Sequence, residues 1–204
     1  MANLMDFLQF SMSDDVVDSL TSQIGAKDPQ QTMVAANGIF SVLTNALSKN
    51  TTDTSALSGL AGALDRDHDG SILDDVMGIL GGRSQPKTNR MVDGAGILGH
   101  VLGGRQNSVV DIISQMSGLD KNGTASLMLK LAPMVMGVLG RVKKQQRMDT
   151  GGLSNFLNTS TQQHNQQNKH TDLITRVLDS DGDGSMMDDI AKVGLKALGN
   201  FFKR

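Results

Sequence analysis

LSGLAGALDRDHDGSILDDVMGIL, at residues 57–80, is an acidic loop set between two apolar segments. Apolar residues recur at helical spacing on both sides, namely Leu57, Leu60 and Leu64 before the loop and Ile72, Val76, Ile79 and Leu80 after it. The stretch therefore predicts a helix, a loop and a second helix. The loop pattern D-x-D-x-D-G-S-x-x-D-D spans residues 65–75 and returns at residues 179–189.

The spacing of oxygen donors in the two loops predicts a pair of calcium sites. Carboxylates at alternate positions can point to one side, and the glycine that follows allows the chain to reverse sharply. The expected ligands of the first loop are Asp65, Asp67, Asp69, the carbonyl of Ser71, and Asp75. Those of the second loop are, in the same order, Asp179, Asp181, Asp183, Ser185 and Asp189. Calcium is preferred over magnesium, the expected competitor, because magnesium demands a more nearly octahedral shell and keeps more of its water.

The pattern resembles the calcium loop of EF-hand proteins in its first seven positions and departs from it at the twelfth. An EF-hand has a bidentate glutamate there, whereas this chain has Val76 and Ile190. We expect the closing carboxylate ligand one position earlier, at the eleventh position of the loop. The aspartate at the tenth position is the alternative, although it is better placed to stabilise the N-terminus of the next helix. The two candidate pairs are Asp75 with Asp189 and Asp74 with Asp188. The short aspartate predicts a Kd on the order of 10⁻⁵ to 10⁻³ M.

Two other interpretations of the loops compete with calcium. An acidic turn can cap a helix without any metal, but two copies that agree at every fixed position favour an ion. An aspartyl-phosphate loop also contains D-x-D-G-S, but it follows a buried strand, and GLAGAL at residues 59–64 does not have the pattern of one. His68 has a non-ligand position, filled by Gly182 in the second loop, and is expected to be exposed. His100 is expected in the core or at its boundary.

Composition excludes several classes of function. The absence of Cys excludes zinc fingers, iron–sulfur clusters and cysteine catalysis. The chain has no Tyr or Trp and only 6 Phe, so it lacks the stacking surfaces of a single-strand nucleic-acid binder, and no nucleic-acid partner is expected. Of the net charge of −2, the two loops carry −9 (ten Asp against Arg66), which leaves +7 elsewhere. Two bound calcium ions would therefore reverse the sign of the net charge, to +2.

Helical spacing dominates the rest of the chain and predicts an all-α, multihelical fold. Ser13 and the pair Asp28-Pro29 are expected helix starts. The similar openings VVD at residues 16–18 and 109–111 predict an internal duplication. Small residues in the second half are expected to let another helix pack close, namely Gly96, Gly99 and Gly103.

The expected organisation is two helical repeats followed by a separate helix–loop–helix. The first repeat covers residues 1–82 with its loop at 65–75, a linker covers 83–93, and a glycine-rich second repeat covers 94–157. A polar mobile linker at 158–171, rich in Gln, Asn, Ser and Thr, leads to a second helix–loop–helix at 172–204 with its loop at 179–189.

The longest apolar run, at residues 127–140, is interrupted by Lys130 and Pro133. It is shorter than the roughly 20 residues that a spanning helix needs, so we expect it in the core and expect no transmembrane segment. The first twelve residues contain Asp6 and no basic residue, unlike a secretory signal. The expected location is therefore cytoplasmic.

The chain also resembles a known bacterial family. The stretches that carry the resemblance are MSDDVVDSL, DPQQT, LDRDHDGSILDDVMGIL, GAGILGHVLGG, LAPMVMGVLG and LDSDGDGSMMDD. Together they are similar to the YidB-related group, domain of unknown function 937, over nearly the whole chain. The resemblance implies a bacterial, multihelical, duplicated protein and supplies no catalytic residue. It also implies that shorter relatives have the helical core without the loops.

The expected function is that of a non-enzymatic helical protein with two calcium-stabilised loops, each fixing the angle between two helices. The second hypothesis is a calcium-responsive interaction module that exposes apolar surface around Met77, Ile79 and Leu80 to an unknown protein partner. A metal-dependent hydrolase ranks last, because such a loop leaves little open coordination and no paired base is visible.

Overall fold

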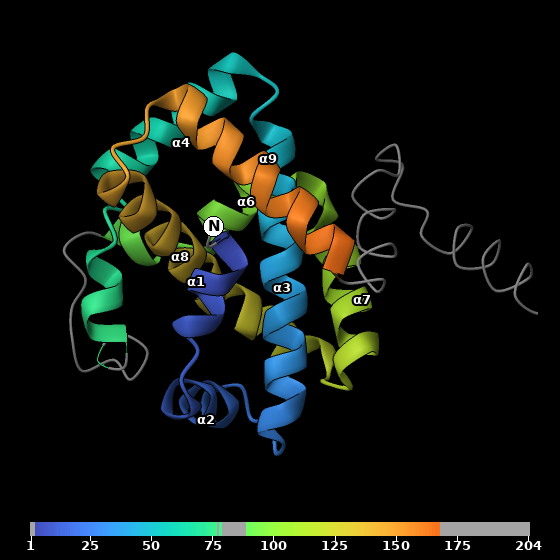
Figure 1. Cartoon of the computed structure of the whole chain (residues 1–204). Helices are drawn as coiled ribbons and strands as arrows, with labels where there is room; N and C mark the ends of the chain where they lie inside the picture. Colours follow the sequence, from blue (N-terminus) through green and yellow to red (C-terminus); the bar gives the residue numbers. More distant parts are fainter. Residues whose placement is uncertain (1–2, 77, 79–88, 168–204) are drawn as a thin grey trace, which may run out of the picture.

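The described part of the chain is built from helices. A computed structural model describes residues 3–76, 78 and 89–167 (Figure 1). No strand occurs in these residues, so the all-α prediction is confirmed. The elements are α1 (Leu4–Phe10), α2 (Asp14–Gln23), α3 (Pro29–Asn50), α4 (Thr54–Arg66), η1 (Ser71–Asp75), η2 (Asn89–Val92), α6 (Gly94–Leu102), η3 (Gly103–Arg105), α7 (Gln106–Ser117), α8 (Lys121–Gln145) and α9 (Thr150–Gln167), where η is a short 3-10 helix.

Helices α3 and α8 form the centre of the fold, and the other elements pack around them (Figure 1). They are the two longest helices, and every residue of α8 from 131 to 140 is buried. Residues from both 1–82 and 94–157 contribute to one hydrophobic cluster. The two segments predicted as repeats therefore share a single core rather than forming two independent ones.

Helix α8 is long and apolar enough to cross a membrane by its length and composition. Within the fold, 72% of its most apolar window is buried. Three of its leucines are almost completely inaccessible to solvent, namely Leu127, Leu131 and Leu139. The prediction that the apolar run at 127–140 belongs to the core is confirmed.

Two helical hairpins, α2–α3 and α7–α8, are joined by turns of the same kind. In each, the first helix is followed by a glycine with positive φ, Gly25 at 71° and Gly118 at 77°. This is a left-handed conformation that glycine adopts without a steric penalty. The second helix of each hairpin then begins after an aspartate N-cap, Asp28 or Asp120, whose side chain accepts a backbone N–H.

Each hairpin is also held by one buried pair of hydroxyl groups. Thr21 Oγ1 lies 2.9 Å from Thr32 Oγ1 in the first hairpin. Ser114 Oγ lies 3.0 Å from Thr124 Oγ1 in the second. In both cases the second partner lies four residues after the aspartate N-cap. The hairpins therefore place hydroxyl side chains and an aspartate N-cap at equivalent structural points.

Helix α9 corrects the prediction for the polar segment at 158–171. Residues 158–167 continue this helix instead of forming a linker, and residues 168–171 lie outside the described part. The helix persists because one face is buried: Leu153, Leu157 and Ser160 recur at intervals of four and three. Ser160 Oγ accepts the backbone N–H of Leu4 at 3.1 Å, which ties α9 to the start of α1.

Candidate functional site

The first acidic loop reverses the chain at its glycine. Helix α4 ends at Arg66, and the Asp67 N–H still donates to the Ala63 carbonyl at 2.9 Å. Gly70 has a φ of 88°, a left-handed conformation that favours glycine. Beside it, the Ser71 N–H donates to Asp69 Oδ1 at 3.0 Å. The predicted first helix and loop are therefore present, and a short 3-10 helix, η1, begins where the second helix was predicted. Residues 77, 79 and 80 of that predicted helix lie outside the described residues.

The loop lies directly on helix α8, where two glycines one turn apart make room for it. A Cβ added at Gly140 would lie 1.7 Å from the carbonyl oxygen of His68. A Cβ added at Gly137 would lie 2.3 Å from Cγ2 of the buried Ile72. Side chains at these two positions would thus force the loop off the helix.

Two basic side chains of α8, Lys143 and Arg141, bind residues of the loop. Lys143 Nζ lies 2.5 Å from Asp65 Oδ1. Arg141 donates to the Gly70 carbonyl at 2.7 Å and also forms an ion pair with Asp74. The Lys143 side chain is only 11% exposed, whereas that of Asp65 is 65% exposed. The loop therefore meets α8 through a basic helix end as well as through the glycines.

Three of the described loop carboxylates contact different protein partners. Asp65 bonds to Lys143, Asp69 accepts the Ser71 N–H, and Asp74 pairs with Arg141. Within residues 3–76, 78 and 89–167, no three His or Asp side chains are grouped so as to hold a metal ion. The side chain of Asp75 and the whole second loop at 179–189, with its five predicted ligands, lie outside the described residues. The calcium ligands therefore stay predictions.

His68 is buried, so the prediction that it is exposed is wrong. It is 5% exposed, because the chain leaving α4 lays the His68 backbone against Gly140. Burial lowers the pKa of His68 below its usual 6.5, and the neighbouring Asp67 carboxylate opposes that shift. Its Nδ1, like the Ser71 hydroxyl, has no hydrogen-bond partner among the described residues. No local sequence signal marks this burial, since Gly182 takes the same place in the second loop.

His100 is the opposite case. It was expected in the core or at its boundary, but it lies exposed on α6, with Nδ1 2.9 Å from the Gly96 carbonyl oxygen. The buried face of α6 instead carries Leu98, Val101 and Leu102. Apolar neighbours in the sequence therefore did not indicate which face of the helix His100 is on.

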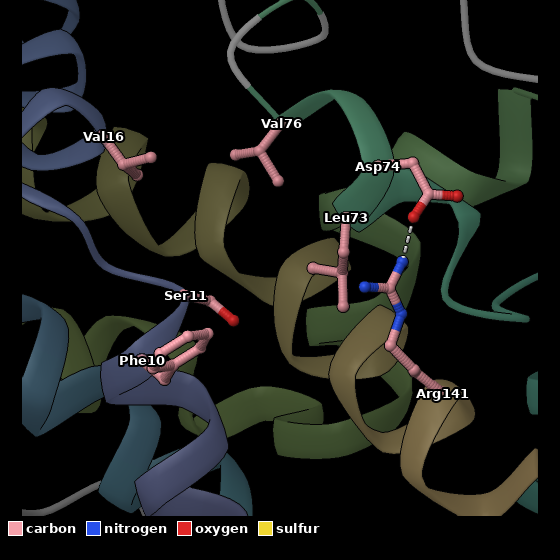
Figure 2. Close-up of a pocket in the computed structure, with 7 residues that line it drawn as sticks. All are labelled: Phe10, Ser11, Val16, Leu73, Asp74, Val76 and Arg141. Atoms are coloured by element: carbon pink, nitrogen blue, oxygen red, sulfur yellow. Dashed lines mark hydrogen bonds and ion pairs between the residues drawn. The ribbon is translucent and has the colours of Figure 1, made fainter. Parts of the chain in front are cut away.

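A groove borders the loop, and sequence reasoning did not find it. It has a volume of ≈ 380 Å³ and is lined by Phe10, Ser11, Val16, Leu73, Asp74, Val76 and Arg141, and we call it the Phe10 groove. In Figure 2, Phe10, Ser11 and Val16 lie across from Leu73 and the Asp74–Arg141 pair. The Phe10 side chain is 91% exposed. One wall therefore comes from η1, the residue after it and Arg141 of α8, and the other from α1, the residue after it and α2.

Comparison with known proteins identifies a family that matches this chain. The model of a family described as a bacterial protein of unknown function (DUF937) matches residues 6–142, which is more than half of the chain and includes the first acidic loop. No curated protein matches. No solved structure matches either.

Proposed function

This chain belongs to the bacterial family of unknown function DUF937, and we propose that it is a non-enzymatic helical protein that binds two calcium ions, mainly for structure. The observation that carries the proposal is the turn at Asp69, Gly70 and Ser71. Its left-handed glycine and its aspartate-capped N–H stand at the positions where a calcium loop reverses around its ion. The second copy of the pattern, at residues 179–189, supports the same chemistry.

The donor set of the first loop fits a hard cation. Its carboxylates and the Ser71 carbonyl are the oxygen ligands that calcium takes. The ammonium group of Lys143 is bonded to Asp65, so calcium has to compete with it. Because Asp65 is largely exposed, such a pair is worth at most about 1 kcal/mol. A divalent ion held by several oxygens can therefore displace it.

Charge supports a structural role for the ion. Five aspartates lie within eleven residues of each loop, and only the first loop contains a compensating Arg66. Such crowded carboxylates repel one another until protonation or a cation neutralises them. Calcium in the first loop would join the end of α4 to η1 and so fix the angle at which the chain turns.

The matching hairpins support the predicted duplication. The left-handed glycine, the aspartate N-cap and the buried hydroxyl pair recur at equivalent points of α2–α3 and α7–α8. We infer that the two hairpins arose from one unit, and that the acidic loops are attached to that older core.

A calcium-responsive interaction module is the second candidate. The groove favours it, because Leu73 within the loop and Val76 directly after it line the groove together with the exposed Phe10. An ion that reorients η1 would change this apolar surface. Met77, Ile79 and Leu80, around which the sequence predicts such a surface, lie outside the described residues. Apolar dye binding that rises with calcium would favour this candidate over a structural role.

Calorimetric titration of the purified chain with calcium tests the main proposal. We expect two sites with Kd on the order of 10⁻⁵ to 10⁻³ M, and loss of both when Asp67→Ala and Asp181→Ala are combined. Asp111→Ala is the matched control, because Asp111 pairs with Lys121 away from the loops and should leave binding unchanged. An absence of binding heat in the unmodified chain would contradict the proposal.

A further inference from the structure

The Phe10 groove has an apolar surface that the described residues leave open. Phe10 is 91% exposed, compared with 47% for Val34, the next most exposed large apolar side chain of the described part. Covering an exposed phenylalanine ring removes apolar surface from water and so favours binding. The ring stands at the mouth of a concave surface rather than alone on a convex one. This arrangement favours an apolar segment as occupant.

The elements that form the N-terminal wall of the groove carry acidic residues and no basic one. The N-terminal wall is drawn from residues 3–26, which contain no Lys or Arg but carry Asp6, Asp14, Asp15 and Asp18. Asp14 and Asp15 are exposed in the first turn of α2, immediately before Val16. On the other wall, Asp74 is 70% exposed. The one cation lining the groove, Arg141, is already paired with Asp74 and the Gly70 carbonyl.

Within this chain, one segment has the complementary chemistry. Residues 190–204, IAKVGLKALGNFFKR, contain four basic residues and no acidic one. At helical periodicity, Lys192, Lys196 and Lys203 share one side, and the opposite side carries the apolar residues Ile190, Val193, Leu198 and Phe201. These residues lie outside the described part of the chain. We propose that the C-terminal segment 190–204 binds in the Phe10 groove of its own chain, with its apolar side on Phe10 and its lysines toward the aspartates.

The chain is long enough for this contact. Between the end of α9 at Gln167 and Ile190 there are 22 residues, which can span about 70 Å when extended. A packed domain of this size has a radius of gyration of about 15 Å. With the second acidic loop free of calcium, the segment can therefore reach any point on the surface without strain in the connection.

The absence of native cysteine allows a clean distance measurement. Spin labels are placed on the full chain at Gln9→Cys, an exposed α1 position beside Phe10, and at Asn200→Cys. We expect a single short distance between the labels. Phe10→Asp should abolish it, as should the combined change Lys192→Asp and Lys196→Asp. Val34→Asp, an equally radical change at an exposed apolar site that does not line the groove, should preserve it.

Each other outcome overturns the proposal. A broad distribution in the unmodified chain, or an unchanged short distance in Phe10→Asp, would mean that the segment does not bind there. Loss of the short distance on dilution with unlabelled chain would assign the contact to a second copy. A label at position 200 that becomes ordered only on anionic lipid vesicles would identify a membrane surface as the partner of the segment.

Discussion

Replacing Gly140 by alanine should detach the acidic loop from helix α8. The added Cβ would lie 1.7 Å from the His68 carbonyl oxygen and 2.8 Å from its carbonyl carbon. Backbone atoms cannot rotate away as a flexible side chain can, so the loop itself has to move. Gly59 in α4 is the matched control, because it is also inside a helix and an added Cβ has no neighbour within 4 Å.

The size of the effect follows from two opposing contributions. Alanine is favoured over glycine inside a helix by about 1 kcal/mol at either position, so this contribution cancels when the two variants are compared. The remainder is the cost of overpacking, typically about 1 to 3 kcal/mol, and a backbone clash favours the upper end. The stability of Gly137→Ala should lie between those of Gly59→Ala and Gly140→Ala, because the added Cβ meets the side chain of Ile72 rather than backbone atoms.

Urea unfolding followed by far-ultraviolet circular dichroism measures the difference. Gly59→Ala should be more stable than the unmodified chain, and Gly140→Ala less stable than Gly59→Ala by about 3 kcal/mol. For a chain of 204 residues, that gap corresponds to roughly 6 to 12 °C in Tm. Equal stability of the two alanine variants would refute the reasoning, because it would mean that His68 does not lie against Gly140.

Three further predictions concern the loop. With a Kd of about 10⁻⁴ M, 5 mM calcium should stabilise the chain by about 2 kcal/mol per site, which calorimetry would record as a rise in Tm, and an unchanged Tm would contradict calcium binding. Lys143→Gln should tighten calcium binding roughly two- to fivefold by removing the competing ammonium, whereas Lys144→Gln, at the exposed next position, should have a smaller effect; equal titrations would disprove the competition. Because burial lowers the pKa of His68, the unfolded chain takes up a proton that the folded chain resists, so in calcium-free buffer stability should fall as pH drops through about 6.5. His68→Gln should reduce that slope; a slope equal to that of the unmodified chain in urea titrations at several pH values would contradict this prediction.

The sequence predicted what depends on neighbours along the chain. The starts of α2 and α3, after Ser13 and at Asp28-Pro29, were expected and are observed. The reversal at Gly70 follows from the need for a left-handed residue after three alternating aspartates. Such features rest on local hydrogen bonds and steric limits, which a few residues specify.

Features that depend on partners distant in sequence could not be read in this way. Lys143 and Asp65 are separated by 78 positions, and nothing near either one indicates the other. The glycines give a second example. Gly96, Gly99 and Gly103 were expected to allow close packing of another helix. A Cβ added at Gly96 would meet the side chain of Asp93, three residues earlier, and one added at Gly99 would lie 4.0 Å from the Gln106 side chain. A Cβ added at Gly103 would have no neighbour within 4 Å. The close approach occurs instead where Gly94 meets the Leu129 backbone and at Gly137 and Gly140.

The composition of α9 misled for a related reason. A segment rich in Gln and Asn has few apolar residues, which is typical of a linker. A helix needs only one buried face, however. Leu157 and Ser160 form that face in a segment whose other residues are mostly polar. The amount of apolar sequence was a poorer guide here than its spacing.

The acidic loop and the Phe10 groove share a wall, so the two proposed binding events should be coupled. Asp74 lines the groove, pairs with Arg141 and lies only four residues after the turn at Gly70. Calcium in the loop adds positive charge beside the rim and should weaken docking of the basic segment 190–204. Coupling between two binding equilibria is reciprocal, so Lys192→Asp combined with Lys196→Asp should tighten calcium binding by the same factor that calcium weakens docking. Calcium titrations with identical affinities in the two chains would show that the sites act independently.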